Sequence, residues 1–264
     1  MPLFEFNLRK IEDVRPWGTP PKKSLHWFGL TDGDYHLDVK GKQLFRYSPE
    51  ILTLWHKQYE AIDDTEFADY CVVRLWEDIL DILPHILEPL PPALFEIIKS
   101  PQLQKNFENS IQSLASEDEW DEMFDLRCQA TQWIWSRKLD TAYLIKGPRI
   151  WLFRYEGEIM IRWDNEGEYI DGMQPWSEIQ GEEKYSVTDF LFELTLFNDR
   201  LMEQMKSRID YIIRENPIPD VEIDLDSLAN DHRDRSIWLR QALNAPPKKL
   251  ETDKILQAIS KLFR

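Results

Sequence analysis

Residues 150–164, IWLFRYEGEIMIRWD, are the stretch that decides the fold class. Two runs rich in β-branched and aromatic residues, 150–155 and 158–164, flank Glu156-Gly157, a pair typical of a two-residue hairpin turn. Side chains alternate between the faces of a strand, so the turn fixes which residues lie opposite one another. One predicted face points to the core and pairs Ile150, Leu152 and Arg154 with Trp163, Ile161 and Ile159.

The opposite face of this hairpin is the candidate partner-binding site. Its residues are Trp151, Phe153, Tyr155, Arg149 and Arg162. Trp and Arg are enriched among the residues that dominate binding energy, and a guanidinium over an indole ring gains cation–π attraction. The alternative is burial, because the long helix that begins near Ser186 could cover this face and make the sheet an inner layer. The sequence leaves both interpretations open.

That long helix has a clear start and a clear apolar face. Ser186 and Asp189 have the three-residue spacing of a capping box, which satisfies backbone donors of the first turn. The apolar positions that follow recur every three or four residues until Pro217 approaches. They are Phe190, Leu194, Phe197, Leu201, Met205, Ile209 and Ile212.

Upstream of the hairpin the pattern changes from sheet to helix. Residues 34–39 and 43–47 predict a hairpin closed by Lys40-Gly41. Asp63 and Glu66 then form another capping box, and Pro84 should kink or end the helix that follows. The apolar face of that helix is predicted to contain Phe67, Cys71, Leu75, Ile79, Ile82 and Ile86.

Two further helices precede residue 150. Pro92 opens a short one through Ile98, and Ser116 with Glu119 caps one that runs to about Leu139. Hairpins separated by helical runs, without strand–helix–strand alternation, predict an α+β fold, a helix-rich single domain with antiparallel hairpins packed against long helices. We expect a main domain at 1–220 and a helical tail at 221–264, broken at Pro246-Pro247, that packs on it.

The charge balance bears on the kind of partner. The chain has 48 acidic and 32 basic residues, a formal net charge of −16, which repels nucleic acid and attracts a basic protein. Simple solubility is the alternative reason for such a charge. Cys71 and Cys128 cannot build a disulfide framework or a structural zinc site. With neither a secretory leader nor a membrane span in view, we expect a cytoplasmic protein.

No nucleotide-binding or hydrolase motif is present in the sequence. GxGxxG, the P-loop, GxSxG and HExxH are all absent, so no cofactor or catalytic residue is assigned. Asp34, His36 and Asp38 alternate along one strand and would share a face, where they could ligate a divalent metal. A strand with its polar side in solvent shows the same alternation, and we assign no metal site.

Several phrases occur in an order that resembles a family of uncharacterised bacterial proteins, a domain of unknown function. They are Leu25-His26-Trp27-Phe28-Gly29-Leu30-Thr31-Asp32-Gly33, Leu44-Phe45-Arg46-Tyr47, Ser136-Arg137-Lys138-Leu139-Asp140-Thr141-Ala142-Tyr143-Leu144, Ile161-Arg162-Trp163-Asp164, and Asp171-Gly172 with Trp176. The resemblance extends to about residue 214. It implies a bacterial cytoplasmic protein, and it carries no catalytic residue over.

The function that these observations favour is non-enzymatic binding. We expect the acidic, aromatic-rich surface to engage a basic protein, for instance as an immunity-type inhibitor of a toxin such as a nuclease. The alternative is a hydrolase-like enzyme that uses dispersed carboxylates, with or without a divalent metal. A structural subunit of a larger complex, recognisable by self-association, is a third hypothesis.

Overall fold

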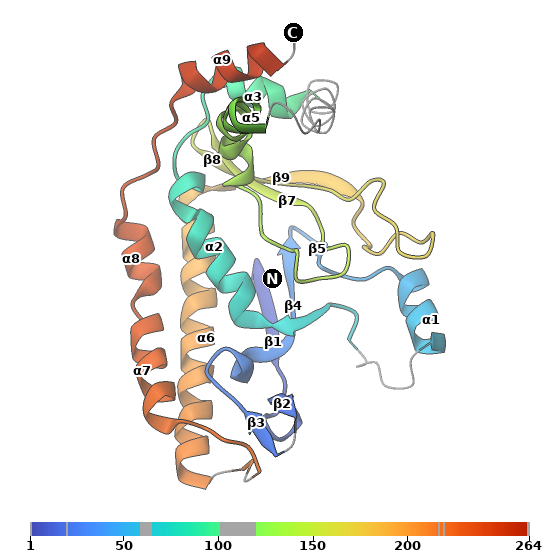
Figure 1. Ribbon diagram of the computed structural model, residues 1–264, viewed down its shortest axis with the longest axis vertical. Helices are drawn as coiled ribbons and strands as arrows, with labels where there is room; N and C mark the ends of the chain where they lie inside the picture. The colour runs from blue at the N-terminus through green and yellow to red at the C-terminus, as the bar shows by residue number, and fades with distance from the viewer. Residues whose placement is uncertain are drawn as a thin grey trace.

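The computed structural model describes residues 2–19, 21–58, 65–100, 120–215, 217–218 and 220–262. In Figure 1 two small antiparallel sheets lie beside one long helix, α6 (Val187–Glu215). Helices α7 (Leu225–Arg235) and α8 (Trp238–Asn244) run along its other side, and α9 (Thr252–Leu262) lies at one end of the molecule. The fold is α+β, as predicted.

The first sheet has the order β1 (Phe4–Leu8), β4 (Asp32–Val39), β5 (Lys42–Leu44), and β6 (Ala68–Cys71) also pairs with β4. The β4–β5 turn is Lys40-Gly41 as predicted, and both residues have positive φ, 53° and 89°. The second strand of this hairpin ends at Leu44 rather than at residue 47, because Phe45 turns the chain with φ 70°. A separate hairpin joins β2 (Trp17–Thr19) and β3 (Lys22–Ser24).

The helix predicted from Asp63 differs from the structure at its start. Residues 68–71 form strand β6, and α2 begins only afterwards, Val72–Ile86. The strand pairs Ala68 with Tyr35 and Cys71 with Asp32, so it satisfies the backbone groups of β4 that face away from β1. Pro84 lies inside α2 and does not end it. The Asp63 cap itself lies outside the described residues.

The next helices are α1 (Pro49–Gln58), α3 (Pro92–Lys99) and α5 (Trp120–Trp135). Pro92 opens α3 as predicted. The predicted Ser116 cap lies outside the described residues. Helix α5 ends before the predicted Leu139 because residues 136–139 run along strand β7 instead, where Leu139 donates its N–H to the Ile150 carbonyl at 2.9 Å.

The second sheet has the order β7 (Ile150–Tyr155), β8 (Glu158–Asp164), β9 (Gln180–Ser186). The β7–β8 register is the predicted one: Ile150, Leu152 and Arg154 lie opposite Trp163, Ile161 and Ile159. The capping box of α6 is also confirmed, since the Asp189 N–H donates to Ser186 Oγ at 3.0 Å.

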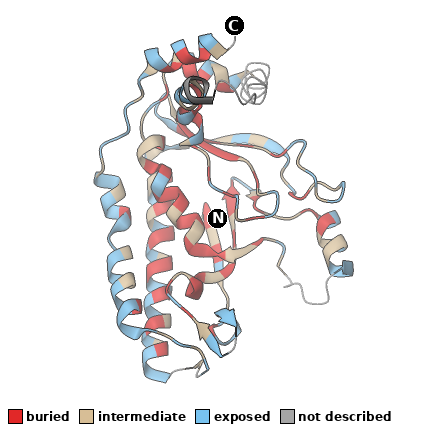
Figure 2. Ribbon diagram, viewed as in Figure 1, coloured by how far each residue is buried: buried red, intermediate tan, exposed pale blue. Residues whose placement is uncertain are grey.

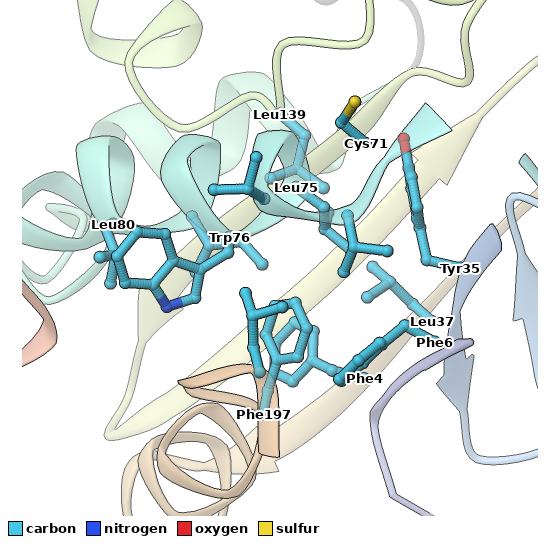
Figure 3. Close-up of a cluster of buried hydrophobic side chains, with 14 of the residues drawn as sticks. Phe4, Phe6, Tyr35, Leu37, Cys71, Leu75, Trp76, Leu80, Leu139 and Phe197 are labelled. Carbon is cyan, nitrogen blue, oxygen red and sulfur yellow. The ribbon is translucent and has the colours of Figure 1, made fainter. Parts of the chain in front are cut away.

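The first core lies between the first sheet, α2, α6 and one face of β7–β8. The whole predicted apolar face of α6 is buried in it. Figure 3 shows its centre, where Phe4 stacks on Phe197 with ring centroids 5.2 Å apart and Trp76 lies nearby. The Trp76 indole N–H donates to Asn198 Oδ1 at 3.2 Å, so the buried donor is satisfied.

The second core lies on the other face of β7–β8. It joins α3, α5 and α9 (Thr252–Leu262) to Trp151 and Phe153. Figure 2 shows the buried residues of both cores in red. The remaining tail helices are α7 (Leu225–Arg235), which packs on α6, and α8 (Trp238–Asn244), which packs on α2. No helix in the described ranges has the length and apolar character to cross a membrane.

Candidate functional site

The face predicted to bind a partner is covered in the structure. Trp151 and Phe153 are 6% and 1% exposed and pack under α3, α5 and α9. Tyr155 stacks on Phe95 of α3, with centroids 3.7 Å apart and rings 5° from parallel. The cover is not α6, the helix that the sequence offered for it, because α6 packs on the opposite face of the sheet. Partner binding by this face stays a prediction, and the structure gives Trp151 and Phe153 a packing role.

The two predicted arginines bind backbone carbonyls rather than the aromatic rings. Arg149 donates to the carbonyls of Asp164 at 2.5 Å and Glu166 at 2.9 Å, and it pairs with the Asp164 carboxylate at 3.4 Å. Arg162 donates to the Ile98 carbonyl of α3. Arg149 therefore fixes the loop after β8, and Arg162 fixes the position of α3 on the sheet.

The cation that lies over the Trp151 ring is Lys138 and not the predicted Arg162. Its ammonium lies 5.0 Å from the Trp135 ring centroid and 5.5 Å from that of Trp151. Residue 138 also forms a β-bridge with Trp151, which holds the backbone at the edge of β7. The sequence carried no signal for this contact, because it depends on where α5 ends.

The three residues of the metal hypothesis have other partners. Asp34 accepts from the Asn7 amide at 3.1 Å, and Asp38 accepts from the Gly41 N–H at 2.7 Å. His36 stacks on Phe67 with centroids 4.0 Å apart, and burial lowers the pKa of its imidazole. Within the described ranges, no group of three or more His, Cys, Asp or Glu side chains is arranged to hold a metal ion.

The segment 136–144, one of the phrases noted in the sequence, anchors several elements. Arg137 is fully buried and donates to the Trp133 carbonyl at 2.7 Å, at the C-terminal end of α5. Thr141 Oγ1 donates to the Pro148 carbonyl at 3.0 Å, and Tyr35 donates to the Tyr143 hydroxyl at 2.9 Å. Gly147 lies so close that an added Cβ would sit 2.1 Å from the Thr141 carbonyl oxygen.

An acid with a perturbed pKa lies next to this segment. Burial raises the pKa of Asp78 to about 8, although Arg74 at 3.2 Å acts in the opposite direction. Arg74 also pairs with Asp140 of the segment. A carboxyl that stays protonated near pH 7 is what general acid catalysis needs, but Asp78 is 5% exposed and is not among the residues that line the cavity beside Asp140.

That cavity, of about 510 Å³, opens between α5, the loop 138–149 and the loop after β8. Its charged lining residues are Lys138, Asp140, Lys146, Arg149 and Glu168. Lys146 pairs with Glu168 at 3.2 Å. Next to it the surface is apolar: Trp135 is 52% exposed and Ile145, which follows the lining residue Leu144, is 73% exposed. A cavity with an apolar rim and paired charges is suited to receive side chains of a partner.

The acidic residues gather beside this cavity. The segment 156–193, which we call the acidic segment, contains 11 acidic and 2 basic residues, a net charge of −9 out of −16 for the chain. It comprises β8, the loop after it, β9 and the start of α6, and its sheet and loop extend away from the tail helices in Figure 1. A charge count along the sequence would have found this segment.

Many acids of this segment are exposed and unneutralised. Across the described part of the chain, no ion pair is found for Glu156, Glu166, Asp171 or Glu182, all of which are exposed. Tyr169 and Ile179, at 54% and 48% exposed, lie among them. The surface therefore combines apolar area with a negative rim.

A family model matches residues 3–258, almost the whole chain. The chain belongs to a family of unknown function, DUF5984. The match confirms the expected membership of a family of unknown function and extends it beyond residue 214, through α7, α8 and most of α9. The bacterial origin stays a prediction. Neither a curated protein nor a solved structure matches the chain.

Proposed function

We propose that this protein is a non-enzymatic binding protein that engages a basic protein through its acidic segment. The observation that carries the proposal is the concentration of charge: 38 residues, 156–193, hold −9 of the net −16. A charge that served solubility alone would not require the acidic residues to be concentrated on one sheet and its loop. A local field of one sign speeds the encounter with an oppositely charged partner.

The geometry of the segment suits a protein rather than a small cation. Strand β9 is an edge of its sheet, and its residues alternate between exposed and half-buried. Tyr169 and Ile179 offer apolar contact area, and the neighbouring cavity adds depth. Interfaces of this composition gain affinity from the apolar centre, while the charged rim sets the association rate and excludes wrong partners.

A concrete form of the proposal is an immunity-type inhibitor in a bacterial cytoplasm. Nucleases present basic surfaces to nucleic acid, and an acidic protein that covers such a surface blocks it. Under this form, the partner would be a basic toxin of the same or a neighbouring cell.

The test is capture of a partner from the source organism's lysate at low and at physiological salt, with three proteins as bait. They are the wild type, a triple variant Glu166→Gln, Asp171→Asn, Glu182→Gln, and a matched control Glu203→Gln, Asp226→Asn, Asp234→Asn. Each variant removes three exposed carboxylates, the first from the acidic segment and the second from α6 and α7. Asp171 has φ 49°, a conformation that Asn adopts readily, so that change should not strain the backbone.

We expect the wild type and the control to retain a stoichiometric basic protein at low salt. The acidic-segment variant should bind it about tenfold more weakly, because each rim charge contributes on the order of 0.5 kcal/mol. Equal loss in both variants would show that only net charge matters, and absence of a basic protein at both salt concentrations would refute the proposal.

The enzyme alternative has one observation in its favour, the pKa of Asp78 at about 8. An acid in that state could donate a proton at neutral pH. Asp78 is only 5% exposed, however, so this hypothesis additionally needs a motion that opens α2 to a substrate. Substrate screening with wild type and Asp78→Asn separates the two functions, because only an enzyme would lose turnover.

A further inference from the structure

The chain segment between α8 and α9, residues 245–251, runs along the outside of the molecule as a strap (Figure 1). It is pinned halfway by a backbone hydrogen bond, from the Lys248 N–H to the Pro84 carbonyl at 3.1 Å. That bond places two consecutive lysines, Lys248 and Lys249, at the C-terminal end of α2 beside His85.

The strap closes a cavity of about 240 Å³, which we call the strap pocket. One wall is α2 and α5, and the other wall is the strap with the first turn of α9. The polar residues that line it are His85, Gln129, Gln132, Ser136, Lys248, Lys249, Glu251 and Lys254.

The charges around the strap pocket are positive on balance. Lys254 pairs with Glu251 at 2.7 Å, so these two cancel. In the described ranges Lys248 and Lys249 form no ion pair, although the chain has 16 more acidic than basic residues. Residues 245–264 contain five basic and two acidic residues, a net +3, so residues 1–244 carry −19. The pocket is therefore a positive site on a strongly negative protein.

His85 lies within the field of these charges. The pKa of its imidazole is lowered by burial first, and then by the charges of Arg137 and Lys248. Arg137 is fully buried and its hydrogen bonds go to carbonyls, those of Trp133 and Glu88. In the described part of the chain no carboxylate forms an ion pair with Arg137, although the charge of Glu88 acts to raise the pKa of its guanidinium.

The donors match an oxyanion. Gln129 and Gln132 lie three residues apart on one face of α5, and Ser136, one residue past the end of that helix, also lines the pocket. Amide N–H, hydroxyl and ammonium groups all donate to phosphate or carboxylate oxygens, and charge-assisted bonds are the strongest of these. A volume of 240 Å³ suits a small metabolite rather than a nucleotide with its base.

We propose that the strap pocket binds a small anion through Lys248 and Lys249, with phosphate or carboxylate oxygens held by the polar face of α5. The ligand needs both walls of the pocket, so it binds only when the strap and α9 are docked. Anion binding therefore stabilises the docked state of the C-terminal helix.

The test is a thermal-shift and calorimetric titration of the full chain at constant ionic strength. The added anion is inorganic phosphate, glycerol 3-phosphate or succinate, with chloride as the reference. Three proteins are compared: the wild type, Lys248→Gln/Lys249→Gln, and the control Lys22→Gln/Lys42→Gln. The control removes the same charge from two exposed lysines outside the pocket.

For the wild type and the control we expect saturable stabilisation by at least one anion, half-complete below about 5 mM. At ten times its Kd, the ligand should raise Tm by about 3 °C. The strap variant should lose at least nine tenths of the affinity. The anion that binds most tightly identifies the source, free phosphate, a phosphomonoester or a carboxylate.

A second measurement localises the site. The imidazole signal of His85, assigned with His85→Gln, should shift on titration with the best anion in the wild type. It should not shift in the strap variant. If no anion saturates, if both lysine variants respond alike, or if the His85 signal stays unchanged, the pocket takes up ions only adventitiously and the proposal is wrong.

Discussion

The two faces of the β7–β8 hairpin are buried in different ways. One face packs against α2 and α6, in the middle of the chain's largest core. The other packs against α3, α5 and α9, so part of its cover comes from the last described helix and reaches the sheet through the strap. The tail is thus part of what buries Trp151 and Phe153, and removing it would expose the face that holds the candidate partner-binding residues. The predicted division at residue 220 stays a prediction.

The largest loss in the free energy of unfolding should follow from a substitution in the first core. Phe197→Ala removes a ring that stacks on Phe4 and meets Phe6 edge-on, with centroids 5.2 and 5.6 Å away. We expect the free energy of unfolding to fall by about 3–5 kcal/mol, because the surrounding helix and strands cannot close the cavity. Urea denaturation measures this change.

Phe192→Ala is the matched control for this change, on the same helix but 60% exposed. It should alter the free energy of unfolding by less than about 0.5 kcal/mol. Equal losses in the two variants would show that α6 is not anchored by its buried face.

The second core should give a smaller and more local response. Ile259→Ala removes a buried side chain of α9 from the cluster around Trp133 and Trp151. We expect a loss of about 2–4 kcal/mol in that cluster, seen as faster amide hydrogen exchange in α5 and α9 while α2 and α6 stay protected. Hydrogen exchange followed by mass spectrometry resolves these segments. Gln257→Ala, at an exposed position of α9, is the control. Acceleration throughout α6 would mean that the two cores unfold as one.

The sequence predicted the elements whose signals are local. The register of β7–β8 follows from Glu156-Gly157 and strict alternation, and the start of α6 follows from Ser186 and Asp189. Strand β6 was missed because the spacing of Phe67, Cys71 and Leu75 also suits a helix, and only the unpaired side of β4 selects the strand. Alternation likewise showed that Trp151 lies on an apolar face but could not show which helices cover it.

One candidate site can be found largely from the sequence, and the other cannot. The charge of the acidic segment can be counted in the sequence, whereas the fold decides which of its acids form ion pairs. The strap pocket needs residues 85, 129–136 and 248–254 to meet, and no sequence pattern relates these segments. Sequence periodicity specifies faces, and tertiary packing decides which faces meet.

The last effect that we predict is a pH dependence inside the first core. Asp78 is buried there, and its pKa is raised to about 8 by burial. Between about pH 4, the value of a free carboxyl, and pH 8, the folded protein keeps a proton that the unfolded chain has released. The contribution of Asp78 to stability therefore falls as the pH rises through this window, by up to about 1.4 kcal/mol per pH unit, and below it the contribution is fully present.

Asp78→Asn removes this titration, while Arg74 keeps Asp140 as its partner. We therefore expect the unfolding free energy of the variant, relative to wild type, to increase steadily from pH 5 to pH 8. Urea denaturation at four pH values measures it, with Glu203→Gln, an exposed position on α6, as the control. Parallel curves for wild type and Asp78→Asn would mean that Asp78 is ionised in the folded protein. A carboxylate ionised at that depth would need Arg74 to offset its desolvation, and the first core would then contain an ion pair where we infer a neutral acid.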